Sequence, residues 1–255
     1  MLFILSPAKT LDFEHEAPIK KSSQPIFKDN AELLINQLKN KSQNELSKLM
    51  SISDKLAELN TIRHKSWEKN HTKKNAKQCI FAFRGEAYNG LNIEQFTQED
   101  LEFAQDRLRV LSGLYGVLRP LDLIQPYRLE MGTKLENPQG KNLYEFWNAQ
   151  VAETLNKHAE KTGTNTLVNL ASNEYFKAVK KDVLKPNVIT PVFKELKNDS
   201  YKVISVYAKK ARGMMSAYII RNRITDSEDL KNFTEEGYMF DENLSSSKEM
   251  VFTRG

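Results

Sequence analysis

The sequence has little that would support thiol, disulfide or metal chemistry. Its 255 residues include one cysteine, Cys79, so no intramolecular disulfide and no metal site built on a cysteine pair can form. Cys79 lies in the apolar run CIFAF, where we expect a buried and unreactive thiol. The histidines show none of the spacings by which helices bind zinc or iron: His15, His64, His71 and His158. We therefore predict neither a metal site nor a cofactor.

Long hydrophobic runs are also missing. No apolar segment approaches the roughly 20 residues that a helix needs to cross a bilayer. The apolar run at residues 2–5 is too short for a signal peptide, and Pro7 and Lys9 follow it at once. With 40% hydrophobic and 28% charged residues, the composition is typical of a globular protein, and we expect it in the cytoplasm.

Charge is distributed unevenly along the chain, although the net charge is only +5. Residues 63–84 hold seven basic side chains and one acidic side chain, and residues 200–225 hold six basic and none acidic. Residues 226–249 hold eight acidic and two basic side chains. This pattern favours a side that faces a polyanion and a solvated opposite end.

Short apolar runs and helix signals alternate along the chain. Apolar spacing predicts helices over 29–40, 45–60 with an interruption, 97–113, 143–161 and 210–224, and Thr97 with Asp100 forms a capping-box pattern. Strands are predicted over 2–5, 80–83, 166–170, 188–193 and 201–208, with a terminal hairpin of 238–240 and 250–253. Without repeats or a flexible linker, this order indicates a mixed α/β fold in a single domain, 1–255.

The segment 111–132 (LSGLYGVLRPLDLIQPYRLEMG) combines chain-breaking and apolar residues. Two glycines and two prolines break its direction, yet its many large apolar side chains are unusual for a surface loop. Arg119 and Arg128 lie within it, close in sequence to Asp122 and Glu130. Charges inside a folded segment require partners. Either the two carboxylates pair with the two arginines, or the arginines bind an anion.

The segment 46–59 (LSKLMSISDKLAEL) is close to the helix-hairpin-helix pattern. Small residues in such a hairpin let backbone N–H groups approach a phosphate, and the next helix adds its positive N-terminus. Ser51 and Ser53 stand where the pattern usually has glycines, while Lys48 and Lys55 flank the hairpin. A simpler interpretation makes Ser53 an ordinary N-cap between two helices.

Several polar residues follow predicted strands. Lys9 comes after the strand 2–5, and Ser172, Asn173 and Glu174 come after the strand 166–170. Side chains at such strand ends often bind ligands in α/β proteins. Two hypotheses remain: a buried ion-pair network, or a polar pocket for a small anionic or nucleotide-like substrate. The candidate residues of this pocket are Lys9, Arg128, Glu130, Ser172, Asn173 and Glu174. No catalytic residue can be assigned to it.

Five blocks resemble one family: SPAKTL (6–11), ISDKL (52–56), the segment 111–132, NLASNEYFK (169–177) and YAKKARG (207–213). In this order they are similar to the YaaA family of bacterial proteins, which is linked to peroxide stress and described as DNA-binding. The resemblance spans essentially the whole chain. It implies a mixed fold particular to that family, with a helix-hairpin-helix element.

The resemblance also implies a function. We expect a monomeric DNA-binding protein of the hydrogen peroxide response that is associated with limiting free iron and oxidative damage. It would grip the backbone of duplex or distorted DNA with little sequence preference. The residues expected at this interface are Lys48, Ser51, Ser53, Lys55, Arg63, Lys209, Lys210 and Arg212. The alternative is an enzyme whose substrate occupies the pocket around Lys9, Arg128 and Glu174.

Overall fold

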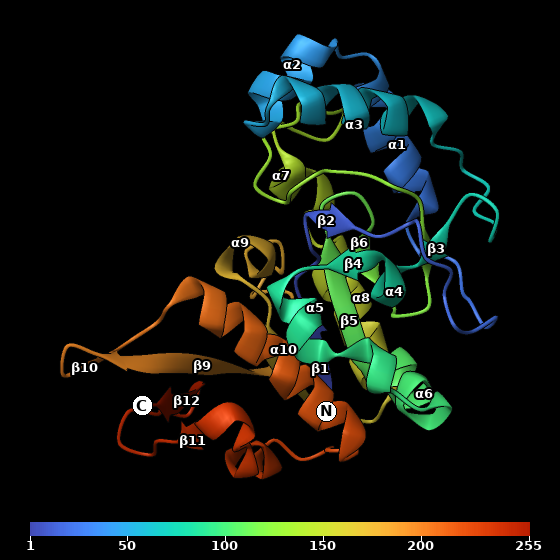
Figure 1. Ribbon diagram of the computed structural model, residues 1–255. Helices are drawn as coiled ribbons and strands as arrows, with labels where there is room; N and C mark the ends of the chain where they lie inside the picture. Colours follow the sequence, from blue (N-terminus) through green and yellow to red (C-terminus); the bar gives the residue numbers. More distant parts are fainter.

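The computed structural model describes residues 1–255 and is built around a mixed β-sheet (Figure 1). The strand order is β11-β12-β9-β8-β1-β5-β6, and β10 pairs with β9. Neighbours among β5, β1, β8, β9 and β12 are parallel, whereas β5–β6, β9–β10 and β11–β12 are antiparallel. The strands are β1 (Leu2–Leu5), β5 (Leu108–Ser112), β6 (Gly116–Leu118), β8 (Thr166–Leu170), β9 (Asn187–Lys197), β10 (Ser200–Lys202), β11 (Met239–Phe240) and β12 (Glu249–Arg254).

Strand β1 lies in the middle of the sheet. Phe3 is in register with Leu108 of β5 and Val168 of β8. All four residues of β1 are buried, which explains why its sequence, LFIL, is uniformly apolar rather than alternating. The central sheet and the interspersed helices confirm the predicted mixed α/β fold.

The helices cover the sheet and extend beyond it. Helix α10 (Ser205–Arg221) packs against β1, β8 and β9, with α5 (Glu86–Leu91) and α6 (Gln98–Arg107) beside it. Helix α8 (Gln150–Lys161) contacts β6. No helix in the structure is both long and apolar enough to span a membrane.

The remaining elements are short. They are the strands β2 (Thr10–Leu11), β3 (Lys77–Gln78), β4 (Phe83–Arg84) and β7 (Leu123–Ile124), the helices α4 (Cys79–Ala82), α7 (Leu143–Trp147) and α9 (Asn173–Phe176), and the 3₁₀ turns η1 (Ile93–Gln95), η2 (Glu228–Asn232) and η3 (Glu235–Gly237). Strand β2 pairs with β4, and β3 pairs with β7.

Three helices form a group at the top of Figure 1, on the far side of β2 from most of the sheet. They are α1 (Lys28–Lys39), α2 (Gln43–Met50) and α3 (Asp54–Ser66). Leu34 of α1 and Ala57 of α3 belong to the same connected hydrophobic core of 63 buried residues as Phe3 of β1. One continuous core therefore supports both this helical group and the sheet.

Several predicted elements are confirmed. Thr97 and Asp100 form the expected capping box at the start of α6. The strand 166–170 is β8, and the antiparallel pairing of β11 with β12 is the expected terminal hairpin. Cys79 is fully buried, and this burial raises the pKa of its thiol well above the usual value, as expected of an inert cysteine.

Two strand predictions are wrong. Residues 80–83 fall mainly in the short helix α4, between β3 and β4, because a short apolar run does not distinguish a buried helical turn from a strand. The alternation predicted over 201–208 ends with β10 at Lys202, and α10 begins at Ser205. The exposed side chains Val203, Val206 and Tyr207 produced that misleading pattern at the junction.

Two helix predictions are also wrong in extent. The predicted helix 97–113 ends at Arg107, and the chain continues as β5, whose five residues are all buried. A strand buried on both faces has no period-2 pattern, so its leucines extended the helical stripe by coincidence. The predicted helix 143–161 is interrupted at Asn148, which has a positive φ of 41° and separates α7 from α8.

Candidate functional site

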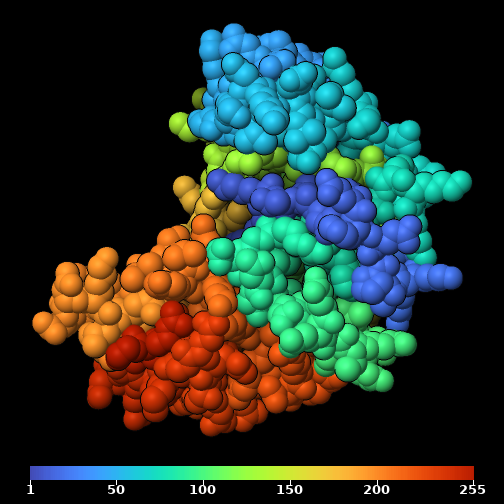
Figure 2. Space-filling model, in the orientation of Figure 1, coloured from blue at the N-terminus to red at the C-terminus, as the bar shows by residue number.

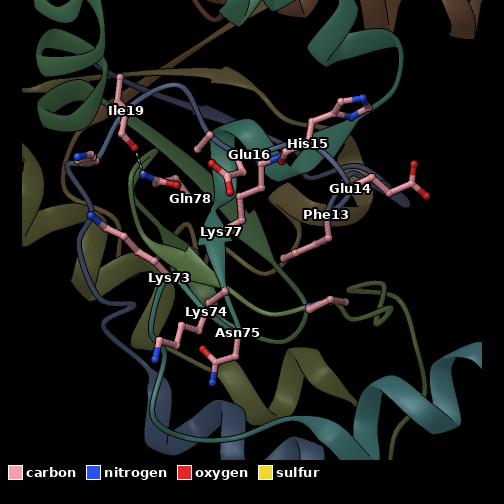
Figure 3. A pocket seen from close by; sticks show the side chains of 14 residues that line it. Phe13, Glu14, His15, Glu16, Ile19, Lys73, Lys74, Asn75, Lys77 and Gln78 are labelled. Carbon is pink, nitrogen blue, oxygen red and sulfur yellow. Dashed lines mark hydrogen bonds between the residues drawn. The ribbon is translucent and has the colours of Figure 1, made fainter.

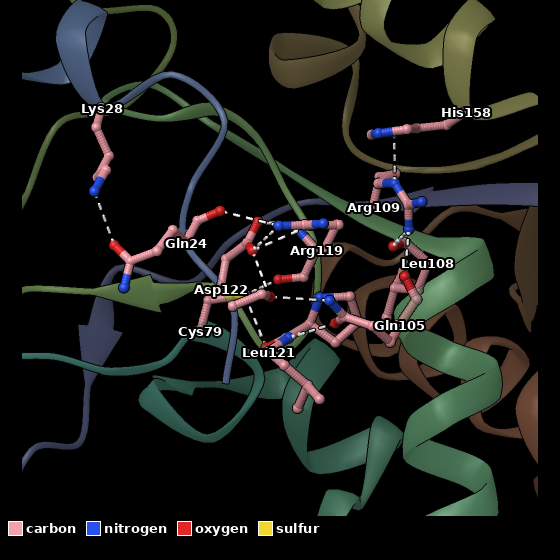
Figure 4. A network of polar contacts seen from close by, with 12 residues as sticks. Gln24, Lys28, Cys79, Gln105, Leu108, Arg109, Arg119, Leu121, Asp122 and His158 are labelled. Atoms are coloured by element: carbon pink, nitrogen blue, oxygen red, sulfur yellow. Dashed lines mark hydrogen bonds and ion pairs between the residues drawn. The ribbon is translucent and has the colours of Figure 1, made fainter. Parts of the chain in front are cut away.

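The arginines of the segment 111–132 are paired within the protein. Asp122 is fully buried, and its carboxylate accepts hydrogen bonds from Arg119 Nη2 at 2.9 Å, the Arg119 backbone N–H at 2.8 Å and Ser23 Oγ at 2.7 Å (Figure 4). Arg128 Nη2 lies 2.9 Å from Glu130 Oε1. The first interpretation of this segment, internal ion pairs, is therefore confirmed.

A second group in Figure 4 extends this pairing to α6 and α8. Arg109 is buried; its Nε donates to His158 Nδ1 at 2.7 Å, and its Nη1 donates to the carbonyl of Gln105 at 2.9 Å. The side chain of Gln105 accepts from the Leu121 backbone N–H at 2.8 Å. Burial, with a smaller effect of Arg109, lowers the pKa of His158 to about 3. His158 is therefore neutral at pH 7, and its Nδ1 accepts a hydrogen bond from Arg109.

A cavity of about 280 Å³ opens at the carboxyl ends of β1 and β8. Its walls come from the segment after β1, the start of α5, the segment after β8 and the first half of α10. In Figure 2 these blue, green, gold and orange segments meet near the middle of the visible face. We call this space the strand-end cavity.

Two serines join the strand ends beside this cavity. Ser6 follows β1 and Ser172 follows β8; the backbone N–H of Ser172 donates to Ser6 Oγ at 2.8 Å, and the two hydroxyls are 3.4 Å apart. The hydroxyl of Tyr88, from α5, donates to the Ser6 carbonyl at 3.1 Å. The parallel register of β1 and β8 fixes this arrangement, because it brings both strands to an end at the same edge.

Most of the predicted pocket residues surround the strand-end cavity. Lys9, Glu130, Ser172 and Glu174 line it, whereas Arg128 and Asn173 do not. Lys9 Nζ is 2.6 Å from Glu130 Oε2, so Glu130 is shared between Lys9 and Arg128. The other carboxylate is also engaged, since Glu174 Oε1 accepts the Gly132 backbone N–H at 2.9 Å.

The basic residues predicted on α10 separate into two groups. Lys209 and Arg212 line the strand-end cavity, whereas Lys210 forms an ion pair with Glu236 at 2.5 Å. Arg212 is largely removed from water and has no ion pair or side-chain hydrogen bond, and burial alone lowers the pKa of its guanidinium. Lys210 therefore lies outside the cavity that Lys209 and Arg212 line.

The hairpin between α2 and α3 is tight and ordered by its own hydrogen bonds. Ser51 adopts the left-handed conformation, with φ 51° and ψ 54°, at the end of α2. Ser53 caps α3 by accepting the Leu56 N–H, while Ser47 Oγ donates to the Ile52 carbonyl at 2.7 Å. Ile52 is partly buried and packs against the core.

Two lysines on the exposed side of this hairpin have no partner. Lys48 and Lys55 are exposed and form no ion pair, and the backbone N–H groups of residues 53–55 donate to no protein acceptor. Arg63 lies at the other end of α3, partly buried; burial and the nearby Arg128 lower its pKa. The hairpin thus offers two cations and three free amides at the N-terminus of a 13-residue helix.

Another cavity, of about 600 Å³, lies between residues 13–20 and 73–78 (Figure 3). Sequence reasoning missed its buried cation, Lys77, whose Nζ donates to the carbonyls of Asp12 at 3.1 Å and His15 at 2.6 Å. Asp12 Oδ2 lies 3.7 Å from the same nitrogen and 2.9 Å from Arg84. Lys77 therefore holds a loop in place. No group of three or more His, Cys, Asp or Glu residues is placed to bind a metal.

Comparisons with known proteins agree over the whole chain. The family model described as "Peroxide stress protein YaaA" matches residues 1–244. A UPF0246 protein of Saccharophagus degradans is 54% identical over 255 residues, covering 100% of this chain and 99% of the relative. UPF0246 proteins of Teredinibacter turnerae and Aliivibrio fischeri are 52% and 50% identical over 254 residues, covering 100% of this chain and 99% and 98% of those relatives. The chain belongs to the YaaA family of peroxide stress proteins.

Proposed function

We propose that this protein binds the DNA backbone with little sequence preference and acts in the response to hydrogen peroxide, where it limits free iron and oxidative damage. The exposed hairpin between α2 and α3 carries this proposal. Ser51, in the left-handed conformation, turns the chain so that α3 begins at the surface beside Lys48 and Lys55. Phosphate groups favour this combination of free N–H groups, helix N-terminus and lysines.

The charge at the hairpin supports a backbone contact rather than base reading. Asp54 is the one acidic residue in the first turn of α3, and two unpaired lysines outweigh it. Both lysines are exposed, and phosphate contacts carry no direct sequence information. The expected partners are therefore duplex and distorted DNA of any sequence, and affinity should fall steeply with salt.

The experiment is a titration of duplex, bubble and single-stranded DNA over a range of salt concentrations. The double variant Lys48→Gln/Lys55→Gln should lower the slope of log affinity against log salt by about 2, because each lost phosphate contact on duplex DNA contributes about 0.9. The matched control is Lys157→Gln/Lys197→Gln, which removes two exposed, unpaired lysines far along the chain.

The control should bind DNA with the wild-type slope. Equal slopes for both double variants would overturn the hairpin as the DNA contact. A strong preference for one sequence among duplexes of the same length would overturn the backbone-only mode of binding.

A further inference from the structure

The strand-end cavity lies where the order of strands reverses. From β1 the chain adds its next parallel strand, β5, on one side, whereas from β8 it adds β9 on the opposite side. Adjacent parallel strands whose connections diverge leave a crevice at their carboxyl ends, and ligands of open α/β sheets bind in such crevices. The cavity opens between β1 and β8 at this edge. Its position follows from the topology rather than from loose packing.

The wall on the α10 side is held rigidly against α5. A Cβ on Gly213 would lie 1.8 Å from the Ala87 carbonyl oxygen, and one on Gly90 would lie 2.1 Å from the Lys210 carbonyl oxygen. The two helices therefore touch backbone to backbone, which only glycine permits. This contact fixes the part of α10 that carries Lys209 and Arg212, so the cavity is formed before any ligand enters.

Four basic residues line the cavity, Lys9, Arg84, Lys209 and Arg212, against three acidic ones, Glu86, Glu130 and Glu174. Glu130 is bound by Lys9 and Arg128, and Glu174 accepts a backbone N–H. Arg212 and Lys209, one turn apart on α10, have no carboxylate partner. A guanidinium that is taken out of water without a partner is costly, and a bound anion would offset that cost.

We propose that the strand-end cavity binds a small molecule through a phosphate monoester, with Arg212 and Lys209 holding the phosphate and the hydroxyls of Ser6 and Ser172 orienting it. Two unpaired cations match a phosphate dianion better than a single carboxylate. A volume of about 280 Å³ suits one small phosphorylated molecule, such as a nucleoside monophosphate or a sugar phosphate. This site is separate from the proposed DNA contact and does not depend on it.

The test is calorimetric titration of the full chain with adenosine monophosphate, ribose 5-phosphate, inorganic phosphate and adenosine. The two monoesters should bind more tightly than adenosine. Stronger binding of adenosine monophosphate would identify a nucleotide site, and stronger binding of ribose 5-phosphate a sugar phosphate site. Adenosine binding as tightly as its monophosphate, or no binding of either monoester at millimolar concentration, would overturn the proposal.

Variants on α10 test which residue holds the phosphate. Arg212→Gln should weaken monoester binding about 10- to 100-fold, the range expected for a lost charge-assisted hydrogen bond, and Arg212→Lys should retain part of the affinity. Lys210→Gln is the matched control, because Lys210 pairs with Glu236 outside the cavity, and it should bind normally. Unchanged affinity in a folded Arg212→Gln protein would overturn the assignment.

The hairpin variant separates phosphate binding in the cavity from the proposed DNA contact. The Lys48→Gln/Lys55→Gln variant should bind the monoesters as the wild type does, because neither lysine lines the cavity. A parallel loss of monoester affinity in this hairpin variant would overturn the separation of the two sites.

Discussion

The segment 111–132 and the hairpin between α2 and α3 both carry basic residues among apolar ones, but their charges are used in opposite ways. In the first, Arg119 lies against the fully buried carboxylate of Asp122, and Arg128 lies against Glu130. In the second, Lys48 and Lys55 are exposed without any carboxylate partner. We call the segment 111–132 the closed region, because its charges are paired internally. We call the hairpin the open region, because its lysines face solvent.

Whether charges are paired, rather than how many there are, therefore indicates where a ligand can bind. Arg119 and Asp122 are only three residues apart, and each is the ion-pair partner of the other. Arg212 is an intermediate case, since it is largely buried like Arg119 but unpaired like the hairpin lysines. Buried charges without partners are rare in proteins, which is why Arg212 supports a binding site more strongly than exposed lysines do.

The largest effect is expected from breaking the closed region at Asp122. Asp122→Ala should lower the free energy of unfolding by about 3 to 4 kcal/mol, because it strips Arg119 and Ser23 of their shared acceptor inside the protein. The measurement is urea unfolding at pH 7. Asp182→Ala, which removes an exposed and unpaired carboxylate, is the control and should change stability by no more than about 0.5 kcal/mol. Similar values for the two variants would show that the Arg119–Asp122 contact does not stabilise the fold.

Local signals in the sequence predicted local structure well. The capping box of Thr97 and Asp100 and the interruption of the helix predicted over 45–60 depend on residues a few positions apart, and both are present. The left-handed conformation of Ser51 has no such signal in the sequence, because serine adopts it at a cost that glycine avoids. Contacts of the turn, including the bond from Ser47 to Ile52, support that conformation.

Features that depend on distant contacts were not predictable. Strand β5 pairs with β1 and β6 at its edges and is buried at all five residues, so its sequence has no alternation to separate it from the preceding helix. The close contact of Gly90 with α10 depends on residues more than 100 positions apart and leaves no periodic signal. The polar residues after β1 and β8 were identified from sequence, but the roles of Tyr88 and Gly90 in forming the cavity wall were not.

A smaller effect is expected when acid protonates His158, which pairs with Arg109 next to the closed region. The pKa of His158 is lowered to about 3 in the folded protein, against about 6.5 when unfolded, so the unfolded chain binds its proton first. The contribution of neutral His158 to the free energy of unfolding is full above about pH 6.5, and it is lost as the pH falls toward 3. With allowance for solvent screening, its contribution to the loss at pH 4 is about 1 to 2 kcal/mol.

The measurement is the free energy of unfolding from pH 7 to pH 4 for the wild type and His158→Gln. Arg109, Arg119 and Lys161 are the charged groups near His158, and all three remain positive over this range. Other titrating groups are common to both proteins, so the difference between the two profiles isolates His158. His158→Gln should lose less stability than the wild type on acidification, and parallel profiles would contradict the neutral, buried state of this histidine.

The smallest effect is expected in the open region. Lys48→Gln/Lys55→Gln should change the free energy of unfolding by no more than about 0.5 kcal/mol, because neither lysine has a partner to lose and exposed substitutions of this kind are nearly neutral. Urea unfolding of this variant, in the same buffer as Asp122→Ala, makes the contrast direct. Removing Lys55 also takes a positive charge away from the positive end of α3, which adds to stability by a few tenths of a kcal/mol. A loss above about 1 kcal/mol would show that these lysines stabilise the hairpin itself. They would then not be free to bind a phosphate.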